Sequence, residues 1–191
     1  MFKLSLIACS SFLFLNACGP VASNIQSKVE DNSKSIEKSS EELGLSRPRS
    51  TPAGYSYEGI GFTMKSLPSD RNPVYRLFNP SNGDHLYTKS IDEVTSAVKN
   101  DGYKFEGIGF MEPKSGNSLV SVHRFYQPST GNHFYTASLP EKNDVMRTDY
   151  RYEGVAFNAA CFGGCENRAN ETVNIHRFYN GRDHFYSITG L

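Results

Sequence analysis

The segment that decides the fold spans residues 123–136 and reads His-Arg-Phe-Tyr-Gln-Pro-Ser-Thr-Gly-Asn-His-Phe-Tyr-Thr. A related segment at residues 75–88 reads Tyr-Arg-Leu-Phe-Asn-Pro-Ser-Asn-Gly-Asp-His-Leu-Tyr-Thr. A third, at residues 176–187, reads His-Arg-Phe-Tyr-Asn-Gly-Arg-Asp-His-Phe-Tyr-Ser and is two residues shorter in its middle. Two aromatic runs around a turn rich in Pro, Gly and Asn are typical of a β-hairpin. The sequence therefore predicts three hairpins of one kind.

The register of these hairpins follows from their turns. If residues 80–83 form the first loop, Phe78 faces His85 and Arg76 faces Tyr87, and side chains alternate between faces along each strand. The two residues missing from the third loop preserve this alternation, whereas one missing residue would invert a strand. One face of each hairpin then carries Leu or Phe and is the expected core. The other carries Arg, an aromatic residue, His and Tyr, and is either a second packed layer or a binding surface.

The second face supplies the candidate ligand-binding residues. Aromatic rings stack on sugar rings, while Arg and His reach hydroxyl groups; the alternative is that large rings simply fill a small core. The candidates are Arg76, His85, Tyr87, Arg124, Tyr126, His133, Tyr135, Arg177, Tyr179, His184 and Tyr186.

A second repeated pattern predicts strands at residues 55–62, 103–110 and 150–157, each containing Glu followed by Gly. Glycine inside a strand pattern indicates a bulge or a close approach of another backbone. Helices are expected between hairpin and strand, where Ser90 and Ser138 each begin a capping box. Gly102 is a plausible end for the first helix. In the second helix, Leu139, Val145 and Met146 are expected to form the buried stripe.

The order of these parts predicts the architecture. The first Glu-Gly strand precedes the first hairpin, and no strand follows the last hairpin. Pairing the first strand with the last hairpin would complete a third unit and leave fewer exposed edges. We expect residues 54–191 to form a mainly β domain with short helices, a pseudo-threefold hairpin-helix-strand repeat closed in this way.

The N-terminus carries an export signal. An apolar run over residues 4–15 is too short to span a membrane and ends at Leu15-Asn16-Ala17-Cys18. This tetrapeptide resembles the bacterial lipoprotein cleavage box, which implies removal of residues 1–17 and lipidation of Cys18; the alternative is an ordinary signal peptide. Several acyl chains would anchor the protein to a membrane. Gly19 favours the outer membrane by the same resemblance, and residues 18–53 are expected to be a flexible tether.

Composition and the remaining cysteines narrow the function classes. Twenty basic residues balance 20 acidic ones in 191 residues, so no basic excess is available to hold nucleic acid. Cys161 and Cys165 are a pair in an exported protein, which favours a disulfide. A zinc site would need about four ligands, and a redox dithiol usually has Cys-x-x-Cys spacing.

The repeated polar residues have structural and functional interpretations. His85, His133 and His184 occupy one repeat position, so they could meet at an axis and bind a metal. The favoured role is to fix a turn or to hydrogen-bond a neighbouring strand, and no metal or other cofactor is expected. Three repeated arginines match the glutamates Glu58, Glu106 and Glu153, which predicts structural ion pairs or, alternatively, a polar groove. A catalytic site is usually unique, so equal repetition argues against an enzyme; a hydrolase using two of these carboxylates is the remaining enzymatic alternative.

The joint motif resembles an uncharacterised bacterial and fungal repeat family. The resemblance covers residues 55–187 and includes hairpins reading Arg-Phe-Tyr-Asn/Gln-Pro-x-x-Gly-Asp/Asn-His-Phe-Tyr-Thr and strands reading Tyr-x-Tyr-Glu-Gly. Similar repeats occur in secreted proteins beside cell-wall or polysaccharide hydrolases. The resemblance implies an accessory, non-catalytic module that binds glycan or peptidoglycan at the cell envelope. A protein-interaction or structural lipoprotein is the alternative.

Overall fold

The computed structural model describes residues 50–65, 71–113, 119–161 and 172–188. Within these ranges the chain is mainly β with two short helices, which confirms the prediction of a mainly β domain with short helices. Cys18, Cys165 and the tether up to residue 49 lie outside the described residues, so the predicted lipidation and disulfide stay predictions. No helix in the described ranges is long and apolar enough to span a membrane.

Nine strands and two helices are described, and their bounds follow the predicted units. They are β1 (Ser56–Lys65), β2 (Arg71–Asn79), β3 (Asp84–Thr88), α2 (Ile91–Asn100), β4 (Lys104–Pro113), β5 (Leu119–Gln127), β6 (Asn132–Thr136), α3 (Leu139–Val145), β7 (Arg151–Ala160), β8 (Thr172–Tyr179) and β9 (His184–Ser187).

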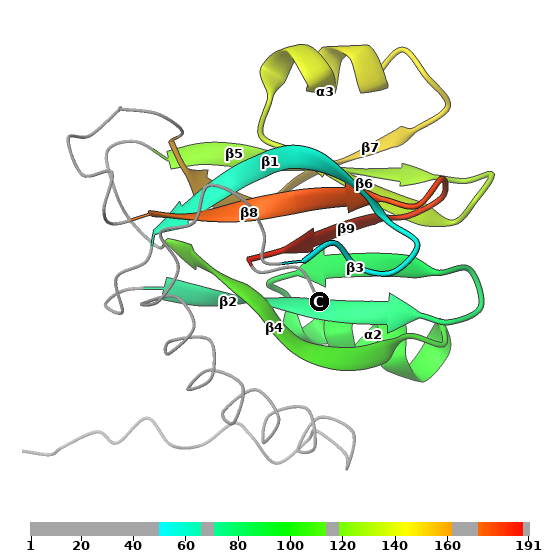
Figure 1. Cartoon of the computed structure of the whole chain (residues 1–191). Coiled ribbons are helices and arrows are strands. Elements are labelled where there is room, and N and C mark those ends of the chain that lie inside the picture. The colour runs from blue at the N-terminus through cyan, green and yellow to red at the C-terminus, as the bar shows by residue number, and fades with distance from the viewer. Residues whose placement is uncertain (1–49, 66–70, 114–118, 162–171, 189–191) are drawn as a thin grey trace, which may run out of the picture.

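The strands form two sheets, ordered β6-β5-β7-β1-β8-β9 and β3-β2-β4 (Figure 1). The predicted hairpin register is confirmed, since Phe78 lies opposite His85 and Arg76 opposite Tyr87. The first strand of each hairpin also pairs on its other side with a Glu-Gly strand: β2 with β4, β5 with β7, and β8 with β1. The N-terminal strand therefore lies against the C-terminal hairpin, with Tyr57 opposite Phe178.

A bulge interrupts each of these pairings near the Glu-Gly step. The register shifts between Tyr57 and Gly59 in β1, and at the corresponding positions in β4 and β7. Gly59, Gly107 and Gly154 have φ values between 103° and 118°. Side chains other than glycine rarely adopt such values. The predicted role of these glycines is confirmed.

The central core consists of aromatic rings from three strands and three hairpins. Phe62, Phe110 and Phe157 meet in mutual edge contacts, with centroids 5.2 to 5.6 Å apart. Tyr87 stacks on Phe110 at 5.5 Å, and two further tyrosines stack in the same way on the other two phenylalanines. Packing is also tight at Gly109, where an added Cβ would lie 3.3 Å from the Tyr87 ring and the ring would have to shift by a few tenths of an ångström.

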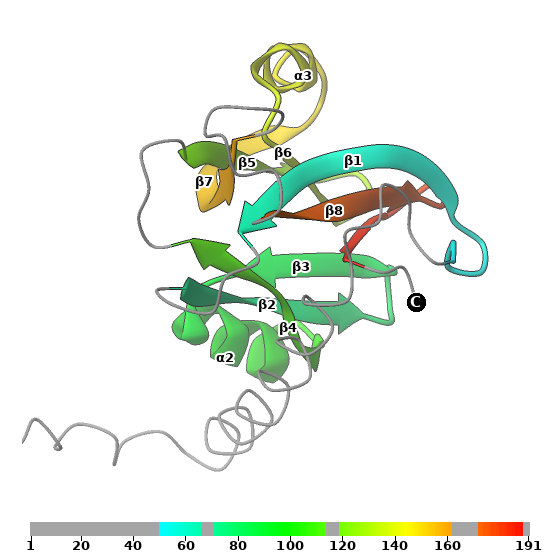
Figure 2. The ribbon, with the colours of Figure 1, turned by 60° about the vertical axis from the view of Figure 1, so that its left-hand side comes forward.

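The two helices differ in how they pack. Ser90 caps α2 by accepting a hydrogen bond from the Glu93 N–H, and α2 buries Val94 and Ala97 against the outer face of the β3-β2-β4 sheet (Figure 2). Ser138 caps α3 in the same way, but α3 has no buried residue.

The prediction that Leu139, Val145 and Met146 form a buried stripe is wrong. Leu139 and Met146 are 62% and 53% exposed, and Val145 is only partly buried. The helix is only seven residues long, too short to lay two apolar turns on the sheet, and it stands away from the strands in Figure 1.

Candidate functional site

Three tyrosines, one from each hairpin, form a closed ring of hydrogen bonds at the centre of the domain. The Tyr135 hydroxyl donates to the Tyr87 carbonyl at 3.0 Å and accepts from the Tyr87 N–H at 2.9 Å. Tyr87 makes the same pair of bonds to Tyr186, and Tyr186 makes them to Tyr135. Each hydroxyl thus satisfies both backbone groups of a residue at least 48 positions away in the chain.

Burial changes the interpretation of these tyrosines. All three side chains have no solvent exposure, and burial raises the pKa of each phenol. A ring without exposed surface cannot stack on a ligand. The three tyrosines are therefore structural residues. The prediction that Tyr87, Tyr135 and Tyr186 contact a ligand is wrong.

The repeated arginines and glutamates form one ion pair in each unit. Arg76 Nε lies 2.8 Å from Glu106, Arg124 Nε 2.8 Å from Glu153, and Arg177 Nε 2.9 Å from Glu58. These are the matched structural pairs that the sequence predicts. The glutamates are about one-third exposed, so the pairs also border the surface.

Two of these arginines hold a second carboxylate, which comes from a helix. Arg124 Nη2 lies 2.9 Å from Glu93 of α2, and Arg177 Nη1 lies 3.0 Å from Glu141 of α3. Each helix glutamate follows its capping serine by three positions. The capping boxes that start the helices therefore also deliver the carboxylates that engage the next hairpin.

Buried aspartates join neighbouring hairpins. Asp84 accepts from the backbone N–H of His133 and lies 2.6 Å from His133 Nδ1. Asp183 makes the same two bonds to His85. Because an ionised carboxylate only accepts, each imidazole donates its Nδ1–H.

This arrangement distinguishes between the two roles expected for the repeated histidines. The Asx side chain serves the next hairpin rather than its own turn, so His85 and His133 make a hydrogen bond to a neighbouring hairpin and do not fix a local turn. No group of three or more His, Cys, Asp and Glu in the described ranges could hold a metal ion.

The third junction between hairpins lacks this bond. Asn132 stands where the other two hairpins have Asp, and its Oδ1 and the Nδ1 of His184 are buried without hydrogen-bond partners among the described residues. Burial and the nearby Arg177 charge lower the pKa of His184 to about 3. The ring stacks on Tyr179 at 4.4 Å, so His184 is held as a neutral aromatic side chain.

A polar cavity of about 440 Å³ lies between α2 and the second hairpin. We call it the Arg124 cleft. Its lining residues are Asn79, Asn82, Leu86, Glu93, Ser96, Ala97, Asp101, Tyr103, Arg124, Tyr126, Gly131, His133 and Glu153. Of the predicted site residues, the structure brings Arg124, Tyr126 and His133 together here, whereas Arg76, His85, Arg177, Tyr179 and His184 lie at the other two junctions.

The charges inside the Arg124 cleft are fixed by their neighbours. Burial alone would raise the pKa of the Glu93 carboxyl, but hydrogen bonds from Arg124 and Thr88 lower it below its ordinary value. Burial and the Asp84 carboxylate raise the pKa of Tyr103, which stays a neutral donor. The cleft therefore presents the ionised Glu93 carboxylate, the Arg124 guanidinium and the Tyr103 phenol at neutral pH.

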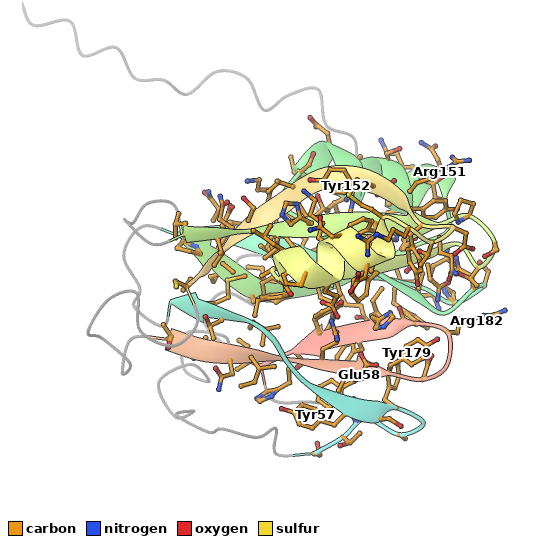
Figure 3. All side chains as sticks on the ribbon, turned by 90° about the horizontal axis from the view of Figure 1, so that it is seen from above. Tyr57, Glu58, Arg151, Tyr152, Tyr179 and Arg182 are labelled. Carbon is orange, nitrogen blue, oxygen red and sulfur yellow. The ribbon has the colours of Figure 1, made fainter. Side chains whose placement is uncertain are left out.

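The remaining two histidines lie on the outer face of the six-stranded sheet. His123 Nδ1 is hydrogen-bonded to the Tyr152 hydroxyl at 2.8 Å, and His176 Nδ1 to the Tyr57 hydroxyl at 3.1 Å. Burial lowers the pKa of both imidazoles. Tyr57 and Tyr152 are 37% and 40% exposed and lie on opposite sides of the molecule (Figure 3).

The sequence does not predict that Glu112 is buried. Glu112 is 1% exposed and accepts from Lys89 Nζ at 3.1 Å and from the Asn158 backbone N–H at 2.7 Å. The sequence signal that could have indicated this buried pair is that two positions, Glu112 and Lys89, differ together from the other two repeats. Glu112 stands where the other strands have Met64 and Ala159, and Lys89 stands where the other hairpins are followed by Ala137 and Ile188.

Comparison with known proteins places the chain in a family. A family model described as "Domain of unknown function (DUF5648)" matches residues 46–160 and again residues 73–190. Neither the curated proteins nor the solved structures contain a significant match. The matched regions include the three hairpins, the Arg124 cleft and the tyrosine ring. The chain belongs to the family described as a domain of unknown function, DUF5648.

Proposed function

We propose that this protein is a non-catalytic, lipid-anchored module of the bacterial envelope that binds a cell-wall glycan in the Arg124 cleft. The observation that carries the proposal is the cleft itself. Its volume of about 440 Å³ lies in the range of small-ligand sites, and most of its lining groups are polar. The lipid anchor at Cys18 and the outer-membrane address are part of the proposal and rest on the N-terminal motif.

The chemistry of the cleft suits sugar hydroxyls. A hydroxyl both donates and accepts, and the cleft offers carboxylate acceptors at Glu93 and Glu153 and a guanidinium donor at Arg124. Half-buried Tyr126 adds an aromatic ring at the wall. The ion pairs hold these groups in place before a ligand arrives, which reduces the ordering cost of binding.

The state of the carboxylates favours binding over hydrolysis. Glycoside hydrolysis needs one carboxyl group whose pKa is raised so that it can donate a proton. In the Arg124 cleft both glutamates pair with Arg124, and the pKa of Glu93 is lowered. Such groups are suited to accept hydrogen bonds from a ligand.

The architecture that supports the site is, in our proposal, a pseudo-threefold ring of three related units. Each unit comprises a hairpin and a Glu-Gly strand, and the third unit combines β8 and β9 with β1. The pairing of β8 with β1 and the cyclic order of the tyrosine bonds support this interpretation. In a ring of this kind the clefts form at junctions between units, and only the Arg124 junction has α2 as a wall.

Tyr126→Ala is expected to weaken binding to purified peptidoglycan or cell-wall polysaccharide about tenfold, which corresponds to about 1.4 kcal/mol. The loss has a physical reason, since the substitution removes an aromatic wall of the cleft. The measurement is a binding isotherm of the full chain on the insoluble polymer.

Tyr179→Ala is the matched control, because Tyr179 holds the corresponding position in the third hairpin, away from the cleft. It should retain wild-type affinity. Equal losses in the two variants, or no binding of the wild type to any cell-wall polymer, would contradict the proposal.

A protein-interaction role is a second candidate, and the exposed apolar side chains of α3 favour it. Leu139 and Met146 are more than half exposed, and Lys142 of α3 lies over the Tyr152 ring at 4.9 Å. A photo-crosslinking residue at position 146 should then capture one envelope protein, while the same residue at exposed Lys99 should not. Equal labelling from both positions would reject this role.

A further inference from the structure

The three repeated arginines are not equally satisfied. Arg124 and Arg177 each contact two carboxylates, one through Nε and one through the terminal nitrogens. Arg76 contacts Glu106 through Nε at 2.8 Å. Among the described residues, no second carboxylate is paired with the terminal nitrogens of Arg76.

The Arg76 side chain nevertheless lies in the same kind of environment as that of Arg177. The Arg177 guanidinium lies over the Phe134 ring at 5.3 Å, and the Arg76 guanidinium lies over the Phe185 ring at 5.1 Å. In both cases Nε lies within 3 Å of the glutamate of the partner strand, and Arg76 Nε donates a hydrogen bond to it, whereas Arg177 Nε is not aligned for one. Beside Arg177 this arrangement presents Nη1 to Glu141, which lies 3.0 Å away. The contact between Arg177 and Glu141 therefore shows that a carboxylate fits beside an arginine in this environment.

We propose that Arg76 is a binding site for the carboxylate group of a ligand. The ligand carboxylate takes the place beside Arg76 that Glu141 takes beside Arg177. The orientation of the Arg76 guanidinium is already fixed by one carboxylate and by an aromatic ring. Its terminal N–H groups form a planar fork that matches the two oxygens of a carboxylate.

The surroundings are compatible with an added negative charge. The side chain of Arg76 is 21% exposed, so a ligand can reach it from solvent. Asp183, at the same junction between hairpins, is fully buried and already accepts hydrogen bonds from His85 and Tyr55. Carboxylates of this kind occur on acidic sugars and on short peptides, and the two sources share the chemistry that Arg76 would recognise.

The site is distinct from the Arg124 cleft, which Arg76 does not line. Its failure would therefore leave the proposed glycan site untouched, and failure of the glycan site would not remove the Arg76 site. The two are tested with different ligands and different variants.

The test titrates the full chain with methyl glucuronide, methyl glucoside and N-acetyl-D-alanine, and follows the arginine Nε–H resonances by NMR. We expect saturable shifts with the two acids and at least tenfold weaker binding of the neutral glucoside. Tighter binding of the glucuronide indicates an acidic sugar as the source, and tighter binding of the N-acetyl amino acid indicates a peptide.

Arg76→Gln and Arg76→Lys should both lose at least tenfold in affinity for the acids. The lysine variant keeps the charge and the pairing with Glu106 but lacks the fork, so it separates loss of binding from loss of folding. Arg147→Gln is the control, because Arg147 is an exposed arginine outside both proposed sites, and it should bind the acids as the wild type does. Equal binding of glucuronide and glucoside, retained binding in Arg76→Gln, or an equal loss in Arg147→Gln would overturn the proposal.

Discussion

Tyr135→Phe is expected to lower the free energy of unfolding by about 2–6 kcal/mol, because it leaves two buried backbone groups unpaired at about 1–3 kcal/mol each. The hydroxyl that is lost satisfies both the N–H and the carbonyl of Tyr87, and the ring around it is fully buried, so water cannot replace it. Urea denaturation of the wild type and the variant measures the difference.

Tyr126→Phe is the matched control for this prediction. Tyr126 lies on the same strand pair but is half-buried, and no hydrogen bond of its hydroxyl is seen in the described ranges. Its removal should change stability by less than about 0.5 kcal/mol. A loss below about 1 kcal/mol for Tyr135→Phe would mean that the ring of tyrosines does not hold the three hairpins together.

Lowering the pH should destabilise the protein through His184, by about 1.4 kcal/mol per pH unit within the titration window. The pKa of His184 is lowered from 6.5 to about 3 in the folded state. Between these values the unfolded chain binds a proton at this position and the folded chain does not, so acid favours unfolding. The effect is absent above about pH 6.5 and amounts to about 2–3 kcal/mol at pH 4.5.

His184→Phe isolates this contribution, because it keeps an aromatic ring against Tyr179 and Phe134 but cannot be protonated. The slope of unfolding free energy against pH between 4.5 and 6.5 should be shallower in the variant by about 1.4 kcal/mol per unit. Equal slopes would show that His184 is not held neutral. Asn132→Asp, which supplies the carboxylate found at the other two junctions, should raise the pKa of His184 in an NMR titration.

Much of the fold could be predicted from the sequence because each local sequence pattern occurs three times in the chain. The parity of the hairpins gave the pairing of Phe78 with His85, and the position of glycine after glutamate gave the bulges. The number of arginines and glutamates gave their pairing. These features depend on strand alternation and turn geometry, which are local.

Features that depend on how the units meet could not be predicted. Alternation placed Arg76 and Tyr87 on one face, but it could not show that the tyrosine reaches the centre while the arginine stays at the junction. Nor could it show that Asp84 bonds to the next hairpin instead of its own turn. Both outcomes depend on the mutual placement of hairpins about 50 residues apart.

The candidate site was predicted in part. Arg124, Tyr126 and His133 are predicted from the repeat and line the cleft, whereas Glu93 also lines it but is not among the predicted site residues. Its role follows from the placement of α2 beside the second hairpin. The exposure of α3 could not be predicted from the sequence either. The spacing of apolar residues in 139–146 is the same whether or not the helix packs against the sheet.

The most direct test of the central proposal is a map of backbone amide shifts on the full chain during titration with soluble peptidoglycan fragments. We predict that the shifts concentrate on Glu93, Asp101, Tyr126 and Glu153, around the Arg124 cleft. Shifts confined to α3 and Tyr152, or no shifts at saturating fragment concentration, would contradict a glycan site in that cleft.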